Sequence, residues 1–200
     1  MAHHPPPRTA RFDELFATYS AQIFAYCRMR SRSVVDAEDA LAEVFLVAWR
    51  RLDDIPEGDA ARAWLYATAR RVTANQLRSA RRSAGLLERL SVWRDDRAAY
   101  GFADTDETSE LVHEGLKRLK PIDREVLLLA EWEQLSSVEI ATVIGCSDTA
   151  ARGRLHRARR RFREAFEYVS TRRMQAAMAH PLDLTDSLTL AGEALGEIHD

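Results

Sequence analysis

The chain has 200 residues, of which 46% are hydrophobic and 30% are charged, and its formal net charge is −2. This apolar content is too high for a wholly disordered chain, and no apolar run is long enough to span a bilayer. The composition therefore predicts a globular protein of one or two domains without membrane insertion.

The chain begins with MAHHPPPR, which has three consecutive prolines and no apolar stretch. It matches neither a secretory signal nor a transit peptide, so we expect a disordered start over residues 1–11 and a cytoplasmic protein. Cys27 and Cys146 lie far apart with no second pair, so we expect reduced thiols and no zinc or other metal site. All of the 29 basic residues except Lys117 and Lys120 are arginine, whose planar side chain suits phosphate and guanine.

The sequence pattern of residues 12–82 predicts a first helical domain. Glycine and proline are scarce there, and apolar residues recur at steps of three and four, as in Leu41, Val44, Phe45, Ala48, Trp49 and Leu52. The stretch DDIPEGDAA, residues 53–61, interrupts this pattern, and a new helix is expected near RAWLYATARR. Residues 83–107 are less periodic and predict a flexible linker. A second helical domain is expected over 108–168, followed by an acidic tail over 169–200.

An acidic face marks the helix expected around DAEDALAEVF. Asp36, Glu38, Asp39 and Glu43 lie beside the apolar stripe. Such a face cannot bind DNA but suits a basic protein partner. Taken alone, this element also fits an ordinary solvated helix face.

A basic element follows between Ala60 and Leu87. It contains no acid and six arginines: Arg62, Arg70, Arg71, Arg78, Arg81 and Arg82. Trp64 and Tyr66 stand at its start, and basic residues interleaved with aromatics favour single-stranded or melted nucleic acid. The two aromatic side chains fit the core of the domain equally well.

The stretch SDTAARGRLHRARRRFR, from Ser147 to Arg163, contains seven arginines. Before it, Ser136 and Glu139 have the spacing of a capping box, Gly145 is placed to end that short helix, and Ser147 can cap the next one. Two helices joined by such a turn predict a helix-turn-helix, whose second helix enters the major groove of DNA.

A helical wheel divides this second helix into an apolar and a polar face. Ala151, Leu155, Ala158, Phe162 and Phe166 form the apolar face, and the opposite face carries Thr149, Arg152, Gly153, His156, Arg157 and Arg160. Gly153 costs about 1 kcal/mol relative to alanine in a helix interior. A close approach of DNA to the backbone explains it, and a solvated basic face is the alternative.

Together these elements resemble the RNA polymerase sigma factors of the extracytoplasmic-function (ECF) class of the sigma-70 family. The resemblance covers roughly residues 12–168. DAEDALAEVF is similar to the segment that binds core polymerase, and RAWLYATARRVTANQLRSARR to the −10 segment. LSSVEIATVIGCS and RLHRARRRF follow the −35 segment almost residue by residue. Arg71 departs from the pattern because an asparagine is common at that position.

The resemblance implies an all-α protein of two small helical domains joined by a flexible linker, the second containing the helix-turn-helix. It implies a sigma factor that binds core RNA polymerase and promoter DNA, needs no cofactor, is not an enzyme and is open to control by an anti-sigma protein. The alternative is a helix-turn-helix regulator that acts without replacing the polymerase sigma subunit. An enzyme is not expected, since no Walker A loop, dinucleotide glycine motif or H-E-x-x-H is present.

The resemblance also assigns residues. Core polymerase is expected to contact Asp36, Glu38, Asp39, Glu43 and Phe45. The −10 element is expected to contact Arg62, Trp64, Arg70, Arg71, Asn75, Arg78, Arg81 and Arg82. The −35 element is expected to contact Arg124, Thr149, Arg152, Gly153, His156, Arg157 and Arg160.

The tail lies outside the resemblance. After Arg173 its charged residues are all acidic: Asp183, Asp186, Glu193, Glu197 and Asp200. Leu188, Ala191, Leu195 and Ile198 recur at helical steps, so a short amphipathic helix from Ser187 onward is one hypothesis. Such a helix could dock on the chain itself or on a partner protein. A disordered, solvated tail is the other hypothesis.

Overall fold

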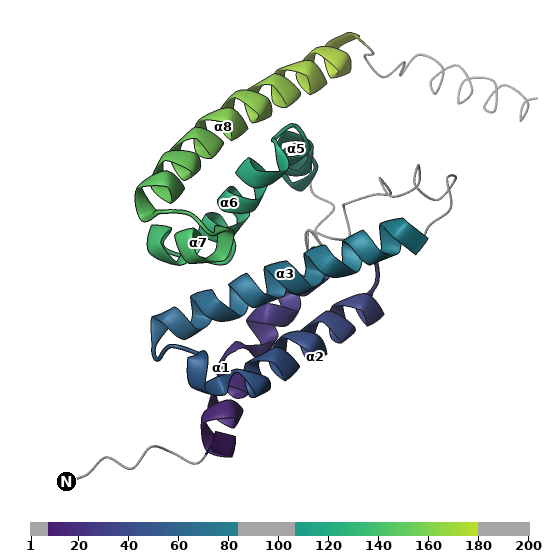
Figure 1. Cartoon of the computed structure of the whole chain (residues 1–200). Coiled ribbons are helices and arrows are strands. Elements are labelled where there is room, and N and C mark those ends of the chain that lie inside the picture. The colour runs from purple at the N-terminus through teal and green to yellow at the C-terminus, as the bar shows by residue number, and fades with distance from the viewer. Residues whose placement is uncertain (1–7, 84–106, 180–200) are drawn as a thin grey trace, which may run out of the picture.

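The computed structural model describes residues 8–83 and 107–179, which form α-helices and one 3-10 helix without any strand. The all-α prediction is therefore confirmed for this part of the chain. The first domain contains α1 (Arg8–Arg28), α2 (Val34–Arg50), η1 (Leu52–Asp54) and α3 (Asp59–Ser83). The second contains α5 (Glu107–Lys117), α6 (Pro121–Glu131), α7 (Ser137–Ile144) and α8 (Asp148–Ala179) (Figure 1).

Two helices extend beyond the domain limits that the sequence suggested. Helix α1 begins at Arg8, whose guanidinium pairs with Asp53 at 2.6 Å and donates to the Trp49 carbonyl at 2.8 Å. Helix α8 continues past residue 168 to Ala179, and Arg173 there pairs with Glu110 of α5 at 2.9 Å. Residues 8–11 and 169–179 are thus helical, while the linker and the remaining tail lie outside the described residues.

The first domain is held together by α1, α2 and α3. Ser33 caps α2 by accepting a hydrogen bond from the Asp36 amide at 3.0 Å. Phe12 and Phe16 of α1 meet the buried Phe45 of α2 edge to face, with ring centroids 6.1 and 4.8 Å apart. This packing fixes which face of α2 is turned to solvent.

The second domain packs α5 and α6 against the long helix α8. Leu116, Leu127 and Ala158 belong to its buried core. Gly115 allows α5 to approach α8, because a Cβ at this position would lie 3.1 Å from the Phe162 ring. None of the helices in residues 8–83 and 107–179 has both the length and the apolar character of a membrane span.

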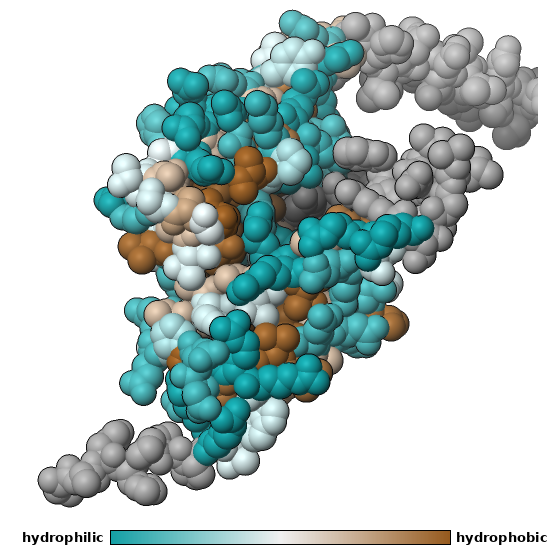
Figure 2. Space-filling view, viewed as in Figure 1, coloured by the Kyte–Doolittle hydropathy of each residue, from teal (hydrophilic) through white to brown (hydrophobic). Residues whose placement is uncertain are grey.

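The two domains share one hydrophobic cluster. Leu65, Tyr66 and Val72 of α3 belong to the same buried cluster as Val126 of α6 and Ile140 of α7. Figure 1 shows α7 lying against α3. The exterior in Figure 2 is mainly hydrophilic, with apolar side chains gathered in patches on both domains. The proposed DNA-binding helix of the first domain therefore has one side covered by the second domain.

Candidate nucleic-acid interface

Helices α7 and α8 form the helix-turn-helix that the sequence predicted. Ser136 and Glu139 make both hydrogen bonds of a capping box at the start of α7. Gly145 ends α7 in the left-handed region, with φ of 72°. Ser147 accepts a hydrogen bond from the Ala150 amide at 3.2 Å and so caps α8. Ser137 of α7 donates to Asp148 of α8 at 2.6 Å, which fixes the angle of the turn.

The two faces of α8 agree with the helical wheel. Ala151 and Ala158 are fully buried and Leu155 and Phe162 are partly buried, so this side holds the helix on its domain. The opposite side of the first four turns is solvent-exposed at Thr149, Arg152, His156, Arg157 and Arg160, with Gly153 half-buried among them. The Arg157 guanidinium lies over Gly153, with Nη1 3.3 Å from the place where a Cβ would be.

Two arginines of this face make ion pairs within α8 itself. Arg152 pairs with Asp148, and Arg160 pairs with Glu164 at 3.6 Å. Both pairs are one helical turn long and largely exposed to water. Exposed pairs of this kind are worth only about 0.3–0.5 kcal/mol. The guanidinium groups can therefore exchange these partners for phosphates at little cost.

Arg124, which the sequence predicts as a phosphate contact, makes two hydrogen bonds to backbone carbonyls within the second domain. Its Nε donates to the Leu116 carbonyl at 2.8 Å and its Nη2 to the Lys117 carbonyl at 3.0 Å. These carbonyls are free at the C-terminal end of α5, so the guanidinium caps that helix. Arg124 is partly buried, and its contact with a DNA phosphate stays a prediction.

Helix α3 presents a second polar stripe to solvent. Arg71, Asn75, Arg78 and Arg82 are all exposed and follow one another at steps of four, three and four residues. They therefore lie on one side of the helix. No acidic residue occurs between Ala60 and Ser83, so all the charges on this side are positive. The side chain of Arg81 lies outside the described residues.

The other −10 candidates are turned inward. Arg62 donates to the Glu133 carbonyl and lies 3.7 Å from the Glu139 carboxylate. Arg70 donates from Nε to the Glu125 carboxylate at 3.1 Å. Trp64 packs partly buried against the first domain's core, as its alternative role predicted.

Glu125 and Glu133 are the residues of this region that the sequence did not reveal. Glu125 also accepts a hydrogen bond from the Tyr26 hydroxyl at 3.2 Å, and Glu133 accepts one from the Tyr66 hydroxyl at 2.6 Å. Burial raises the pKa of Glu133, against the lowering effects of Tyr66, Arg30 and Arg62. Burial likewise raises the pKa of both tyrosines. No local pattern marks these two acids, because their partners are 55 to 99 residues away.

The acidic side of α2 is open to solvent in part. Glu38, Asp39 and Glu43 are exposed, and Asp36 is half-buried near the N-terminal cap. Phe45 is only 4% exposed and supports the helix from within, so it is not available to a partner in this conformation. Val35 and Leu46 are exposed apolar residues beside the acids. In the sequence, Leu46 lies outside the apolar stripe of this helix. That position is the signal by which it could have been predicted to be an exposed apolar residue.

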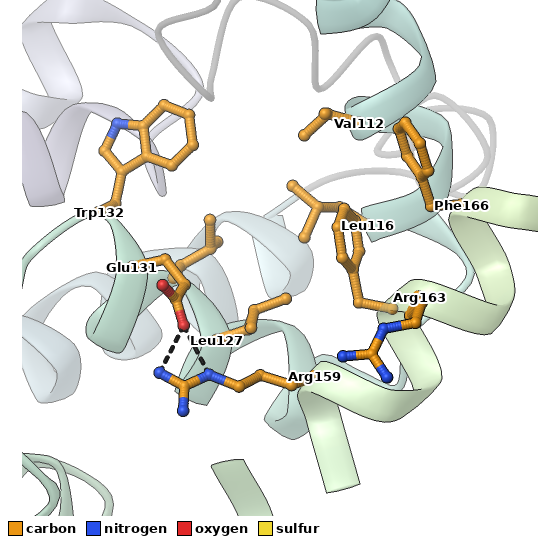
Figure 3. A pocket seen from close by; sticks show the side chains of 10 residues that line it. Val112, Leu116, Leu127, Glu131, Trp132, Arg159, Arg163 and Phe166 are labelled. Atoms are coloured by element: carbon orange, nitrogen blue, oxygen red, sulfur yellow. Dashed lines mark hydrogen bonds and ion pairs between the residues drawn. The ribbon is translucent and has the colours of Figure 1, made fainter. Parts of the chain in front are cut away.

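An apolar pocket of about 460 Å³ opens on the second domain (Figure 3). Val112 and Leu116 of α5, Leu127 of α6 and Phe166 of α8 contribute to its lining, with Trp132 at its edge. Arg159 closes one side and pairs with Glu131 at 2.8 Å. Within the described residues, no group of three or more histidine, cysteine or acidic side chains could hold a metal ion.

Comparison with known proteins gives concordant results. Residues 15–83 match the family model Sigma-70 region 2, and residues 109–162 match Sigma-70, region 4. The chain is 30% identical to the RNA polymerase sigma-E factor of Streptomyces avermitilis over 84% of this chain and 89% of that protein. It is 27% identical to the ECF RNA polymerase sigma factor SigM of Mycobacterium tuberculosis over 86% and 85%.

A solved structure shares the fold. It is the complex of the sigma factor RpoE with the anti-sigma factor NepR from Bartonella quintana, matched with a TM-score of 0.58 at 23% identity. The match covers 78% of this chain and 96% of that one.

Proposed function

Since this chain belongs to the sigma-70 family of RNA polymerase sigma factors, we propose a division of promoter recognition between its two domains. As an ECF-type sigma factor it binds core RNA polymerase and directs it to promoters. The individual residues that make these contacts, and the place of each domain in the complex, are the substance of the proposal.

The second domain reads the −35 duplex with α8. The observation that carries this assignment is the exposed face of Thr149, Arg152, His156 and Arg157 at the start of a correctly capped recognition helix. Arginine bidentate to guanine is the commonest specific contact in the major groove. Gly153 lets the DNA approach the helix, and Arg160 reaches the adjacent phosphates. Arg124 holds the end of α5 in place and remains a candidate phosphate contact.

The first domain captures the −10 element with α3. The exposed stripe of Arg71, Asn75, Arg78 and Arg82 is acid-free and tracks the phosphates of a melted strand. Arg81 adds charge to the same end of the helix. Arg62 and Arg70 become accessible once the second domain has moved away from them, and Trp64, partly buried at the start of α3, remains a further candidate contact.

Core polymerase binds the exposed side of α2. Glu38, Asp39 and Glu43 offer negative charge to a basic surface, and Asp36 adds to it near the start of the helix. Val35 and Leu46 supply apolar area between these charges. Interfaces that combine buried apolar contacts with complementary charge gain both affinity and orientation.

Membership in the sigma factor family also suggests where the protein works and which partners it has. We infer that the protein works in the cytoplasm, where it meets polymerase, without catalytic chemistry or a cofactor of its own. The fold neighbour RpoE is bound to the anti-sigma factor NepR. By extension, we infer that an anti-sigma protein binds this chain.

Reconstitution with core polymerase tests the function directly. Core enzyme alone and core enzyme with this protein are given fragmented bacterial DNA, and the RNA made is sequenced. We expect new transcripts that start at fixed distances from shared −10 and −35 sequences. Transcription that needs another sigma subunit would instead identify a helix-turn-helix regulator. The Arg157→Ala variant should lose preference at the −35 positions, whereas Arg163→Ala, outside the recognition face, should not.

A further inference from the structure

The side of α3 turned to the second domain carries Arg62, Tyr66 and Arg70, which stand four residues apart and so lie in one row. Each side chain of this row meets an acceptor from the second domain. Arg62 bonds to the Glu133 carbonyl, Tyr66 to the Glu133 carboxylate at 2.6 Å, and Arg70 to the Glu125 carboxylate at 3.1 Å. The row is thus satisfied within the chain.

The acceptors have the chemistry of a nucleic-acid backbone. Carboxylate oxygens, like phosphate oxygens, are anionic and accept hydrogen bonds from guanidinium groups. Glu125 is held in place by three groups at once, since the Tyr26 hydroxyl and the Arg30 guanidinium also face it at 3.2 and 4.0 Å. Its side chain is only 18% exposed. The Nε of Arg70 is therefore occupied by this carboxylate in the closed arrangement.

We propose that the second domain masks part of the −10 surface, with Glu125 and Glu133 in the places that phosphates take on promoter binding. This inference rests on the proposed role of α3 in DNA binding. The free chain is then closed, and binding exchanges intramolecular carboxylates for DNA. The stripe of Arg71, Asn75, Arg78 and Arg82 lies on another side of α3, is exposed in the closed chain and remains available for first contact.

The closed arrangement is held by more than charge. The buried cluster that includes Leu65 and Val72 of α3 continues into Val126 of α6 and Ile140 of α7. Tyr26 and Tyr66 also meet edge to face, with ring centroids 5.2 Å apart. Opening therefore exposes apolar surface and has a free-energy cost. In this proposal the binding of core polymerase to α2 contributes the free energy that offsets this cost.

The test uses the full chain with the double substitution Glu125→Gln and Glu133→Gln. Glutamine keeps the shape of each side chain but removes the negative charge that faces Arg70 at position 125 and the Tyr66 hydroxyl at position 133. Affinity for a fluorescein-labelled 12-nucleotide single-stranded DNA of mixed sequence is measured by anisotropy at low salt. We expect affinity to rise by about 2- to 10-fold, in line with the loss of the Arg70–Glu125 ion pair and of the charge on Glu133. X-ray scattering should show a larger radius of gyration.

The control is Glu114→Gln with Glu167→Gln, which removes the same charge from exposed positions of the second domain. An equal rise in affinity in this control would show a general charge effect and overturn the masking. The masking would also be overturned if the wild-type chain and the test variant bound the single-stranded DNA with equal affinity. If the wild-type chain and both variants fail to bind single-stranded DNA at all, the role assigned to α3 is wrong, and the masking falls with it.

A second inference concerns the pocket of Figure 3 and rests on separate observations. The pocket is apolar, with Leu116, Leu127 and Phe166 in its lining, and Arg159 and Arg163 of α8 stand along one side. We infer that residues 187–198 of this chain occupy it. In the sequence of this segment, Leu188, Ala191, Leu195 and Ile198 recur at helical steps, and its charged residues are acidic.

Chain length and charge both permit this docking. Helix α8 ends at Ala179, 13 residues beyond Phe166, which is about 20 Å along the helix axis. Residues 180–186 span up to about 23 Å when extended, so residue 187 can return to the level of the pocket. The negative charge of the segment complements Arg159 and Arg163 beside the pocket. The occupied pocket covers Trp132, which is 49% exposed.

Photo-crosslinking in the full chain tests this docking. Leu195 is replaced by p-benzoylphenylalanine, and products are mapped by mass spectrometry at protein concentrations low enough to avoid association. We expect crosslinks to the peptides around residues 127–132 and 159–166. The same probe at Glu193, on the charged side of the segment, should give at least several-fold less. Crosslinks to α3, to a second molecule or to no site would overturn the assignment of this occupant.

Discussion

The substitution Gly153→Ala should make the protein more stable and yet a poorer binder of −35 DNA. Alanine is favoured over glycine by about 1 kcal/mol in a helix interior. The nearest neighbour of the new Cβ is Nη1 of Arg157 at 3.3 Å. This atom is the far end of a flexible exposed side chain and can move by a few tenths of an ångström. The expected net gain is about 0.5–1 kcal/mol, or roughly 1–4 °C in Tm for a chain of this size.

The loss of binding has a separate cause. The added methyl group enlarges the face of α8 that enters the groove and displaces the resting position of Arg157. A bidentate arginine contact contributes about 1–3 kcal/mol of discrimination. We expect Gly153→Ala to lower affinity by about 5-fold or more, and Arg157→Ala to lower it at least as much without the rise in Tm.

Calorimetry and fluorescence anisotropy measure the two effects on the same samples. The probe is the duplex that the wild-type protein enriches from a randomised DNA pool. Gly145→Ala is the matched control, because φ there is 72° and an alanine is strained by about 1–2 kcal/mol although its Cβ meets no atom within 4 Å. A lower Tm for Gly153→Ala would refute the helix argument, and unchanged affinity would show that DNA does not approach this position.

Three further outcomes follow from named contacts. Asp39→Arg changes the exposed side of α2. It should leave Tm within about 1–2 °C but weaken capture of core polymerase by about 10-fold or more. Unaffected capture would contradict the assignment of α2 as the polymerase-binding helix. Asp123→Asn should lower stability by about 1–3 kcal/mol in urea titration, because its buried carboxylate pairs with Arg161 across α6 and α8; unchanged stability would count against this pair. Burial raises the pKa of Cys27 to about 12, so at pH 8 only about 1 in 10,000 of its thiols is ionised. Iodoacetamide should modify the half-buried Cys146 first, and early modification of Cys27 would contradict its burial.

The helix-turn-helix was predictable because its signals are local. A capping box, a left-handed glycine and a serine cap each act within four residues, and all three occur at the expected positions. The helical wheel of α8 predicted its buried and exposed faces for a similar reason, since both faces follow from the sequence of a single helix. The end of α8 was placed too early because Val169, Ser170 and Thr171 are weak helix formers. The ion pairs of Arg173 with α5 outweigh that preference.

The covered side of α3 could not be predicted from these signals. Arg62 and Arg70 are ordinary members of a basic run in the sequence, and nothing near them distinguishes them from Arg71 or Arg78. Their partners Glu125 and Glu133 lie on α6 and in the turn after it. Only the packing of α3 against the second domain brings the two sets together. The burial of Phe45 could not be predicted for the same reason, because Phe12 and Phe16 cover it from another helix.

The density of arginine in α8 has two physical causes rather than one. Arg159 and Arg161 point toward the domain, where they pair with Glu131 and with the buried Asp123 of α6. Arg152 and Arg157 are on the exposed side. Arg161→Lys should therefore lower stability, since an ammonium cannot reproduce the planar pairing, and leave −35 preference intact. Arg157→Lys should leave stability intact and change the preference. A variant that changed both properties would mean that folding and recognition are not separable along this helix.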